Sequence, residues 1–211
     1  MSWSCATRML SITDRMTPRR ASRQRTTAET SVSADLQIDG TGNATVSTGI
    51  PFFDHMLTLL AKHSLFDLRI EARGDLDVDF HHTVEDTGIV LGQCFNEALG
   101  EKTGIRRYGS ILLPMDEALA QVAIDLGGRP FLTFRIVETP GPIASFDFDL
   151  VEEFLRAFAN NAAMNLHVEI QYGRNSHHMA EAIFKGLAKS LDHACQIDPR
   201  VSGVPSSKGV L

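Results

Sequence analysis

Apolar and polar residues alternate along several short segments, and between these segments apolar residues recur three or four positions apart. The alternation predicts strands and the wider spacing predicts helices, in an order that occurs twice. In the first half we expect strands over 31–38, 44–48 and 65–72, the first two joined by a hairpin turn, and helices after Pro51 and His81. In the second half we expect strands over 111–113, 118–126, 131–137 and 165–172, and helices over 149–162 and after His177.

The two halves align on Leu68 and Leu166, which lie in matching predicted strands. His55 and Glu153 each stand thirteen residues before these leucines. We therefore expect them at equivalent places on the first helix of each half. The repeated order of elements predicts an internally duplicated α+β chain, which suits one large domain or two small fused halves.

A five-residue motif, His-His-x-x-Glu, occurs once in each half, over 81–85 and 177–181, at the start of a predicted helix. A helix places the glutamate one turn beyond the histidines, so all three gather at one end. Adjacent histidines point about 100° apart on a helix, too far for both to bind one metal easily. Two facing motifs could instead hold two metals, each taking one histidine from each pair.

Eight residues are therefore candidate metal ligands, and all of them carry an imidazole or a carboxylate: His55, His81, His82, Glu85, Glu153, His177, His178 and Glu181. The internal symmetry divides them into two sets of four, and it leaves open which glutamate belongs to which metal. Donors of this kind suit Mn, Fe(II), Co or Zn, and four protein ligands with room for substrate favour a six-coordinate ion such as Mn.

Composition and charge exclude several classes of protein. The chain is 43% hydrophobic and 22% charged, which is typical of a globular protein, and no apolar run approaches the ~20 residues that span a bilayer. Three scattered cysteines, Cys5, Cys94 and Cys195, indicate neither a disulfide framework nor a thiolate zinc site, so we expect a cytoplasmic location. The net charge of −6 argues against a nucleic-acid partner.

Residues 1–25 differ from the rest because they are rich in Ser, Thr and Arg and lack periodicity. Three explanations stay open: a disordered tail, a start codon upstream of a true start at Met16, or a short organellar transit peptide. We expect this extension to lie outside the fold. The first repeat half then covers 26–110, and the second half covers 111–211.

Seven stretches together resemble the imidazoleglycerol-phosphate dehydratase family of histidine biosynthesis, from about residue 25 to the C-terminus. In chain order they are GIPFFDHML (49–57), DFHHTVEDTG (79–88), RYGS (107–110), PMDEAL (114–119), GRP (128–130), NSHHMAE (175–181) and PSSKG (205–209). The resemblance implies a duplicated fold, each half a four-stranded mixed sheet packed on two helices, like domain 2 of ribosomal protein S5. It also implies two manganese ions per active site, sites shared between neighbouring subunits, and a homo-oligomer of 24 subunits.

The chain departs from the family pattern at two positions. Many members carry His where this chain has Glu153, which is still a metal-ligating residue type, so we expect altered metal affinity there. Many members also carry Gln where Leu59 stands, and we expect no substrate contact from that position.

The activity that the resemblance implies is the removal of water from imidazole glycerol phosphate, giving imidazole acetol phosphate by way of a metal-bound imidazolate. The proton that is lost is not next to a carbonyl, so the ring must first expel the hydroxyl with help from the metal. A carboxylate then removes the proton. The resemblance assigns this acid/base role to Glu29, reaching a neighbour's site, and assigns substrate contacts to His63 and to a phosphate-binding group that includes the C-terminal tail: Arg107, Arg129, Lys185, Ser206 and Lys208.

Two other classes of protein compete with a lyase. A phosphate-ester hydrolase with two metals would favour Asp-rich ligand sets, whereas the ligands here are mainly His. A metal-storage shell or a binding protein with a ribosomal-protein-like fold would leave Glu29 and the Ser-Ser-Lys-Gly tail without a purpose. The reaction product separates these classes.

Overall fold

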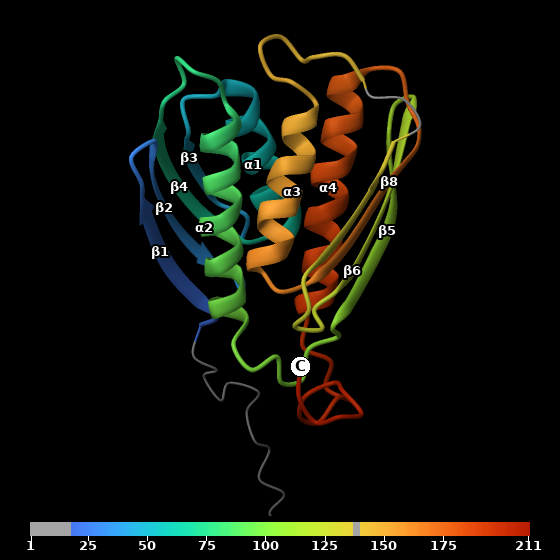
Figure 1. Ribbon diagram of the computed structural model, residues 1–211. Coiled ribbons are helices and arrows are strands. Elements are labelled where there is room, and N and C mark those ends of the chain that lie inside the picture. Colours follow the sequence, from blue (N-terminus) through green and yellow to red (C-terminus); the bar gives the residue numbers. More distant parts are fainter. Residues whose placement is uncertain (1–17, 137–139) are drawn as a thin grey trace, which may run out of the picture.

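The computed structural model describes residues 18–136 and 140–211 (Figure 1). The first half contains β1 (Arg20–Thr26), β2 (Thr30–Gln37), β3 (Ala44–Ser47), α1 (Pro51–Ser64), β4 (Asp67–Gly74) and α2 (His81–Leu99). The second half contains β5 (Tyr108–Met115), β6 (Ala118–Asp125), β7 (Phe131–Arg135), α3 (Asp149–Asn161), β8 (Asn165–Tyr172) and α4 (Ser176–Cys195). The order of strands and helices is therefore the same in both halves.

Each half forms one four-stranded mixed sheet. The strand orders are β1-β2-β4-β3 and β5-β6-β8-β7, and in both sheets only the last pair is parallel. Leu68 of β4 lies opposite Leu36, and Leu166 of β8 lies opposite Ile124, so the two leucines occupy equivalent places. The predicted duplicated α+β fold is confirmed.

Three details of the sequence prediction require correction. β3 pairs in parallel with β4 and does not form a hairpin with β2, because the chain crosses over to the far side of β4. All but the last residue of β1 lies within the predicted extension 1–25: Arg23 pairs with Glu97 and Arg25 with Asp86, and these ion pairs accommodate an arginine-rich segment at a sheet edge. The second half begins at Tyr108 rather than at residue 111. Residues 1–17 lie outside the described part.

The helices fill the space between the two sheets (Figure 1). α2 packs on the first sheet and α4 packs on the second. Across the middle, α1 packs against α4 and α2 packs against α3, so that helices of the two halves interlock. One hydrophobic core results, which includes Phe53, Phe95, Phe154 and Phe184.

The contact between α2 and α3 depends on two glycines of α2. A Cβ atom on Gly88 would lie 2.9 Å from the carbonyl oxygen of Phe154, and one on Gly92 would lie 2.7 Å from that of Phe158. The two backbones therefore approach so closely that no side chain fits between them.

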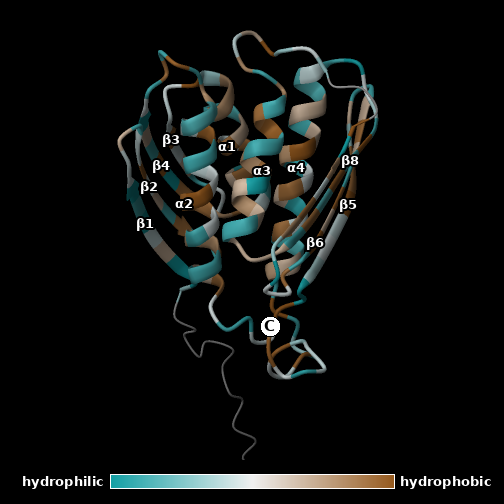
Figure 2. Ribbon diagram, in the orientation of Figure 1, coloured by the Kyte–Doolittle hydropathy of each residue, from teal (hydrophilic) through white to brown (hydrophobic). Residues whose placement is uncertain are grey.

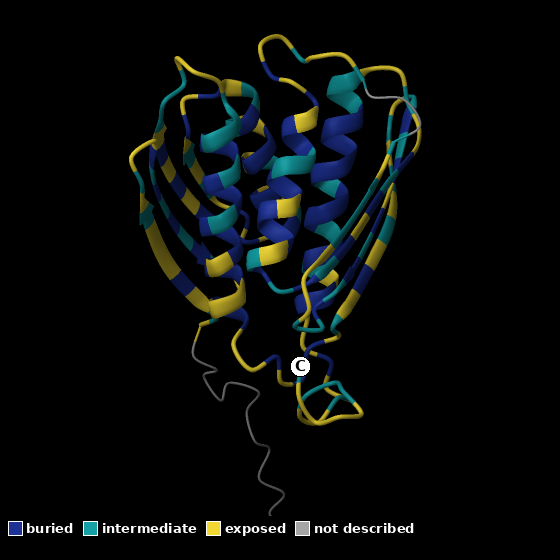
Figure 3. Cartoon of the chain, in the orientation of Figure 1, coloured by how far each residue is buried: buried dark blue, intermediate teal, exposed yellow. Residues whose placement is uncertain are grey.

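Burial alternates along the strands, as Figures 2 and 3 show in bands of hydropathy and of exposure. In β2, for example, Val32, Ala34 and Leu36 are buried, while Ser33 and Asp35 are partly exposed. The inner face of each sheet thus covers the helices and the outer face carries polar groups. Within the described residues, no helix is long and apolar enough to cross a membrane.

The topology places the starts of the helices at a common end of the molecule. β3 and β4 are parallel neighbours, so they end at the same edge of the sheet, and α1 and α2 follow them. The same holds for β7 and β8 with α3 and α4. Residues in the first turns of the four helices therefore gather at one end of the interlocked helix layer, which we call the metal end (Figure 1).

Candidate metal centre and active site

The predicted ligands stand in the first turns of these helices for local reasons. Pro51 begins α1, where a missing N–H group costs nothing. The side chain of Asn175 caps α4 by accepting hydrogen bonds from the backbone N–H groups of His177 and His178. His55 is the fifth residue of α1 and Glu153 is the fifth residue of α3, so the equivalence predicted for them is confirmed.

His55, His177 and Glu181 form the one group of three potential metal ligands within residues 18–136 and 140–211. Nε2 of His55 lies 3.0 Å from Oε1 of Glu181, and Nε2 of His177 lies 3.1 Å from the same oxygen. One donor atom from each residue lies within 4.8 Å of the others. Two imidazoles and one carboxylate at this spacing fit a single divalent ion.

Glu181 is buried, and Lys185 donates a hydrogen bond to its second oxygen. Burial alone would raise the pKa of this carboxyl, but hydrogen bonds from Lys185, His55 and His177 outweigh it and lower the pKa to about 2. The carboxylate is therefore charged at neutral pH and ready to bind a cation.

A second group of predicted ligands lies where α2 meets α3. His81 and Glu153 line one cavity of about 450 Å³, together with the carboxylates of Asp79, Asp147 and Asp149. Nε2 of His81 also lies 3.9 Å from a carboxylate oxygen of Glu85. The structure thus brings the first-helix residue of each half to the motif of the other half, because the helices interlock.

The second histidine of each motif contacts a different carboxylate. Nδ1 of His82 lies 3.0 Å from Asp75 and 3.7 Å from Glu29. Nδ1 of His178 lies 2.7 Å from Glu117. The hydrogen bonds to Asp75 and to Glu117 raise the pKa of His82 and of His178, and the contact with His178 lowers the pKa of Glu117 to about 2.

Within the described chain, neither His82 nor His178 joins the three-residue group, and no group combines one histidine from each motif. The predicted arrangement in which each metal takes a histidine from each pair is therefore not formed inside a single chain. Asp75 and Glu117 were missed as site residues. A signal for Glu117 was present, since it holds the place in the second half that Glu29 holds in the first.

Four of the predicted phosphate-side residues lie at the other end of the molecule. The backbone N–H group of Arg107 donates to the carbonyl of Ala194 near the end of α4, and its side chain donates to Asp125 and to the carbonyl of Pro205. The hydrogen bond to Asp125 raises the pKa of Arg107. This effect outweighs burial, which by itself would lower the pKa. Gly128, beside Arg129, packs against Leu211. We call this region, with Ser206 and Lys208, the tail end (Figure 1).

Two predicted substrate residues lie along the packed pair α1 and α4. Lys185 contacts Glu181, as described, and His63 stands in the last turn of α1. Burial, together with the positive charges of Lys185 and Lys189, lowers the pKa of His63. The ring of His63 is therefore neutral at pH 7 and can donate or accept a hydrogen bond.

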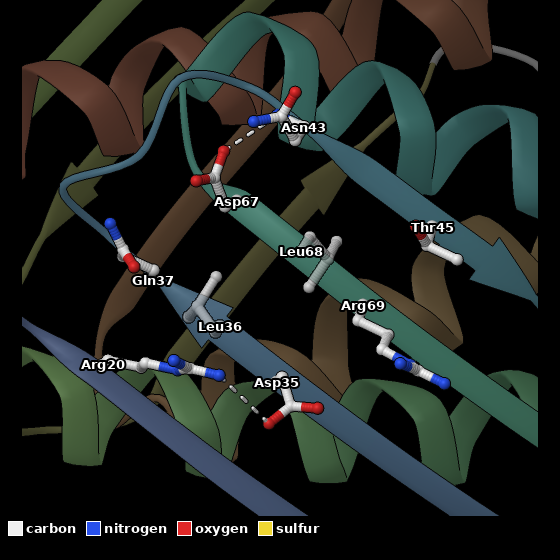
Figure 4. A pocket seen from close by; sticks show the side chains of 9 residues that line it. All are labelled: Arg20, Asp35, Leu36, Gln37, Asn43, Thr45, Asp67, Leu68 and Arg69. Atoms are coloured by element: carbon white, nitrogen blue, oxygen red, sulfur yellow. Dashed lines mark hydrogen bonds and ion pairs between the residues drawn. The ribbon is translucent and has the colours of Figure 1, made fainter.

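A separate hollow on the outer face of the first sheet contains none of the predicted site residues (Figure 4). Each of its charged groups has a partner: Arg20 lies 4.0 Å from Asp35, Arg69 lies 2.5 Å from Glu71, and Asp67 accepts hydrogen bonds from the backbone N–H groups of Thr41 and Asn43. These internal contacts account for its charges, so we place the functional site at the helix starts.

The fold and the site define a class: a duplicated α+β protein with a histidine–carboxylate metal centre built from interlocked helices. Comparison with known sequences identifies the family. The sequence profile of the imidazoleglycerol-phosphate dehydratase family matches residues 48–191, and the chain belongs to this family. The chain is therefore a lyase, a dehydratase of histidine biosynthesis, as the sequence resemblance implied.

Individual relatives match this chain along nearly their whole length. The chain is 54% identical over 193 residues to an imidazoleglycerol-phosphate dehydratase of Geobacter metallireducens, covering 92% of this chain and 99% of the relative. It is 58% identical over 195 residues to the one of Akkermansia muciniphila, covering 92% of this chain and all of the relative. The crystal structure of the Staphylococcus aureus enzyme superimposes with a TM-score of 0.77 at 39% identity, covering 85% of this chain and 99% of that chain.

Proposed function

We propose that the chain dehydrates imidazole glycerol phosphate to imidazole acetol phosphate with two manganese ions per active site. Family membership supports the reaction, and the donor set supports the metal. His55, His177 and Glu181 would hold one ion, and His81, Glu85 and Glu153 would contribute to the other. A bound divalent ion would polarise the imidazole ring of the substrate as a Lewis acid.

Glu29 is the proposed acid/base. It ends the turn between β1 and β2 beside the metal end, 3.7 Å from Nδ1 of His82. Its side chain is 56% exposed, so the carboxylate is open to a substrate or to a neighbouring chain. Because Glu29 lies near His82 without a hydrogen bond to it, its carboxylate could take a proton from the substrate carbon next to the imidazole ring.

The active site is proposed to be shared between subunits, and the two ends of the chain support this. His177 and Ala194 are separated by 17 residues of α4, which at about 1.5 Å per residue spans about 26 Å. Arg107 lies beside Ala194. A small phosphate ester bound at the metal end cannot reach the tail end of the same chain. The tail end of one subunit therefore completes the metal end of another.

Shared sites link metal binding to assembly, since ligands from different chains turn metal affinity into association energy. We therefore propose that manganese holds a homo-oligomer together, with the 24 subunits that the family resemblance implies. The cytoplasmic location expected from the cysteines also belongs to this proposal, and Cys94 and Cys195 are both free and buried.

One experiment tests the reaction and separates it from hydrolysis. Manganese-loaded protein is incubated with imidazole glycerol phosphate, and the product is analysed by mass spectrometry. We expect loss of one water with the phosphate retained. Release of free phosphate would support the hydrolase instead.

A second measurement tests the metal and the assembly. We expect chelation to reduce the particle size in analytical ultracentrifugation, and readdition of Mn²⁺ to restore it. Only traces of bound transition metal after loading would contradict the metal proposal. An unchanged particle size after chelation would contradict the link to assembly.

A further inference from the structure

The second histidine of each motif is held at Nδ1 by a carboxylate that is not among the eight ligands. Oδ2 of Asp75 lies 3.0 Å from Nδ1 of His82, and Oε2 of Glu117 lies 2.7 Å from Nδ1 of His178. A carboxylate at Nδ1 keeps the proton on that nitrogen, which leaves Nε2 of the ring as the free metal-binding atom.

The other oxygen of Glu117 is fixed by the backbone. It accepts hydrogen bonds from the N–H groups of Arg174 and Asn175, at 3.3 and 2.8 Å. Glu117 therefore ties the turn between β5 and β6 to the loop that enters α4. These two backbone contacts hold the carboxylate of Glu117 in place.

Glu29 and Glu117 occupy equivalent places in the two halves. Leu36 and Ile124 lie opposite the equivalent leucines of β4 and β8, and counting back seven residues from each gives Glu29 and Glu117. Both directly precede the second strand of their sheet. Yet Glu117 contacts its histidine at 2.7 Å, whereas Glu29 stands 3.7 Å away.

The residues that directly follow β4 and β8 account for these different distances. The residue seven positions after Leu68 is Asp75, whose carboxylate occupies Nδ1 of His82. The residue seven positions after Leu166 is Gly173, and a Cβ atom there would lie 2.6 Å from Cγ of Met179. A side chain at that place would have to displace Met179, and the carboxylate at Nδ1 of His178 is that of Glu117.

We propose that Asp75 and Glu117 are positioning residues that fix the ring orientation of His82 and His178 for metal binding, and that Asp75 thereby leaves Glu29 free for proton transfer. The inference rests on the proposed function for the bound metal and for the role of Glu29. The two halves use equivalent glutamates differently because the first half has a second carboxylate, Asp75, at Nδ1 of its histidine, whereas the second half has glycine at the equivalent place.

Titration of Mn²⁺ into the chelator-treated full chain tests the positioning role without any substrate. We expect Glu117→Ala to weaken metal binding by about 10- to 100-fold, the usual effect of losing the partner of a metal-bound histidine. Glu169→Gln, which removes one carboxylate from the same sheet, should bind metal as the wild type does. Wild-type affinity in Glu117→Ala would overturn the proposal.

Because Glu117 also anchors the loop before α4, a second variant separates the two roles. Asn175→Ala removes the side-chain cap from the same loop and leaves the contact at Nδ1 intact. We expect a lower melting temperature from this variant, with metal affinity closer to the wild type than in Glu117→Ala. Equal losses of affinity in both variants would show that Glu117 acts through the loop.

The first half provides the sharper test, because Glu29 lies close enough to replace Asp75. We expect Asp75→Ala to weaken metal binding less than Glu117→Ala does, while turnover falls because Glu29 moves onto His82. Glu29→Gln alone should leave metal affinity unchanged, and the double variant should bind metal as weakly as Glu117→Ala. If the effects of Asp75→Ala and Glu29→Gln on metal affinity are additive in this double-mutant cycle, Asp75 does not keep Glu29 away from His82, and this part of the proposal is wrong. These affinities are measured without substrate, so they test the positioning role even if the protein shows no dehydratase activity.

Discussion

Two inactive variants of this chain should restore each other's activity when they assemble together. One variant, Glu29→Gln, damages the metal end but is expected to keep its metal and therefore to assemble, and the other, Lys208→Ala, damages the tail end. The two ends are separated by about 26 Å along α4, as worked out above from the helical rise. If each site takes its metal end and its tail end from different chains, as proposed, a mixed oligomer contains some sites in which both ends are intact.

The expected size of the restoration follows from random assembly. With equal amounts of the two variants, half of the metal ends and half of the tail ends are intact, so about one quarter of the sites are complete. Co-expression with two different affinity tags, followed by sequential purification, yields the mixed oligomers for a turnover assay. Two different substitutions of Lys208, assembled together, provide the control that cannot complement. Activity no higher than the sum of the parents would refute the shared site.

Three further predictions concern single positions. Glu29→Gln should lower turnover by about 10²–10⁴ with normal metal content, whereas Glu181→Gln should lose metal as well; more than a tenth of wild-type turnover in Glu29→Gln would assign the proton transfer to another group. A chain that starts at Met16 should keep full activity and particle size, and a large loss in either would show a role for the preceding residues. Gly92→Ala should destabilise the fold by about 1–3 kcal/mol in chemical unfolding, because its Cβ would meet the backbone of α3, whereas Gly141→Ala, with open space around it, should be nearly neutral.

Local pattern predicted most elements, and it failed where pairing partners are distant. Alternation located β8 at 165–172 as observed, and the repeat alignment placed His55 and Glu153 correctly on their helices. β1 was missed because three of its seven residues are arginines, which find acidic partners only in the folded chain. The hairpin prediction failed because turn residues fix where a strand ends but not which strand it joins.

The site shows the same limit. The motif spacing identified which residues could bind a metal, but it could not show that α1 of one half packs against α4 of the other. That packing decides that His55 joins His177 rather than His81. Likewise, no spacing along the sequence reveals that Glu117 lies against His178, because the two residues are brought together by the pairing of β6 with β8.

The duplication offers a reason for the proposed sharing of the site between two chains. Each half directs its helices toward the same end, so both motifs and both first-helix residues gather there. The segments that carry Arg107, Arg129 and the C-terminal tail connect the opposite ends of strands and helices, and α4 holds them a full helix length away. No rearrangement of side chains closes such a distance. We therefore propose that binding the metal and the phosphate of one substrate requires a second copy of the chain, which would make the oligomer a condition of the chemistry.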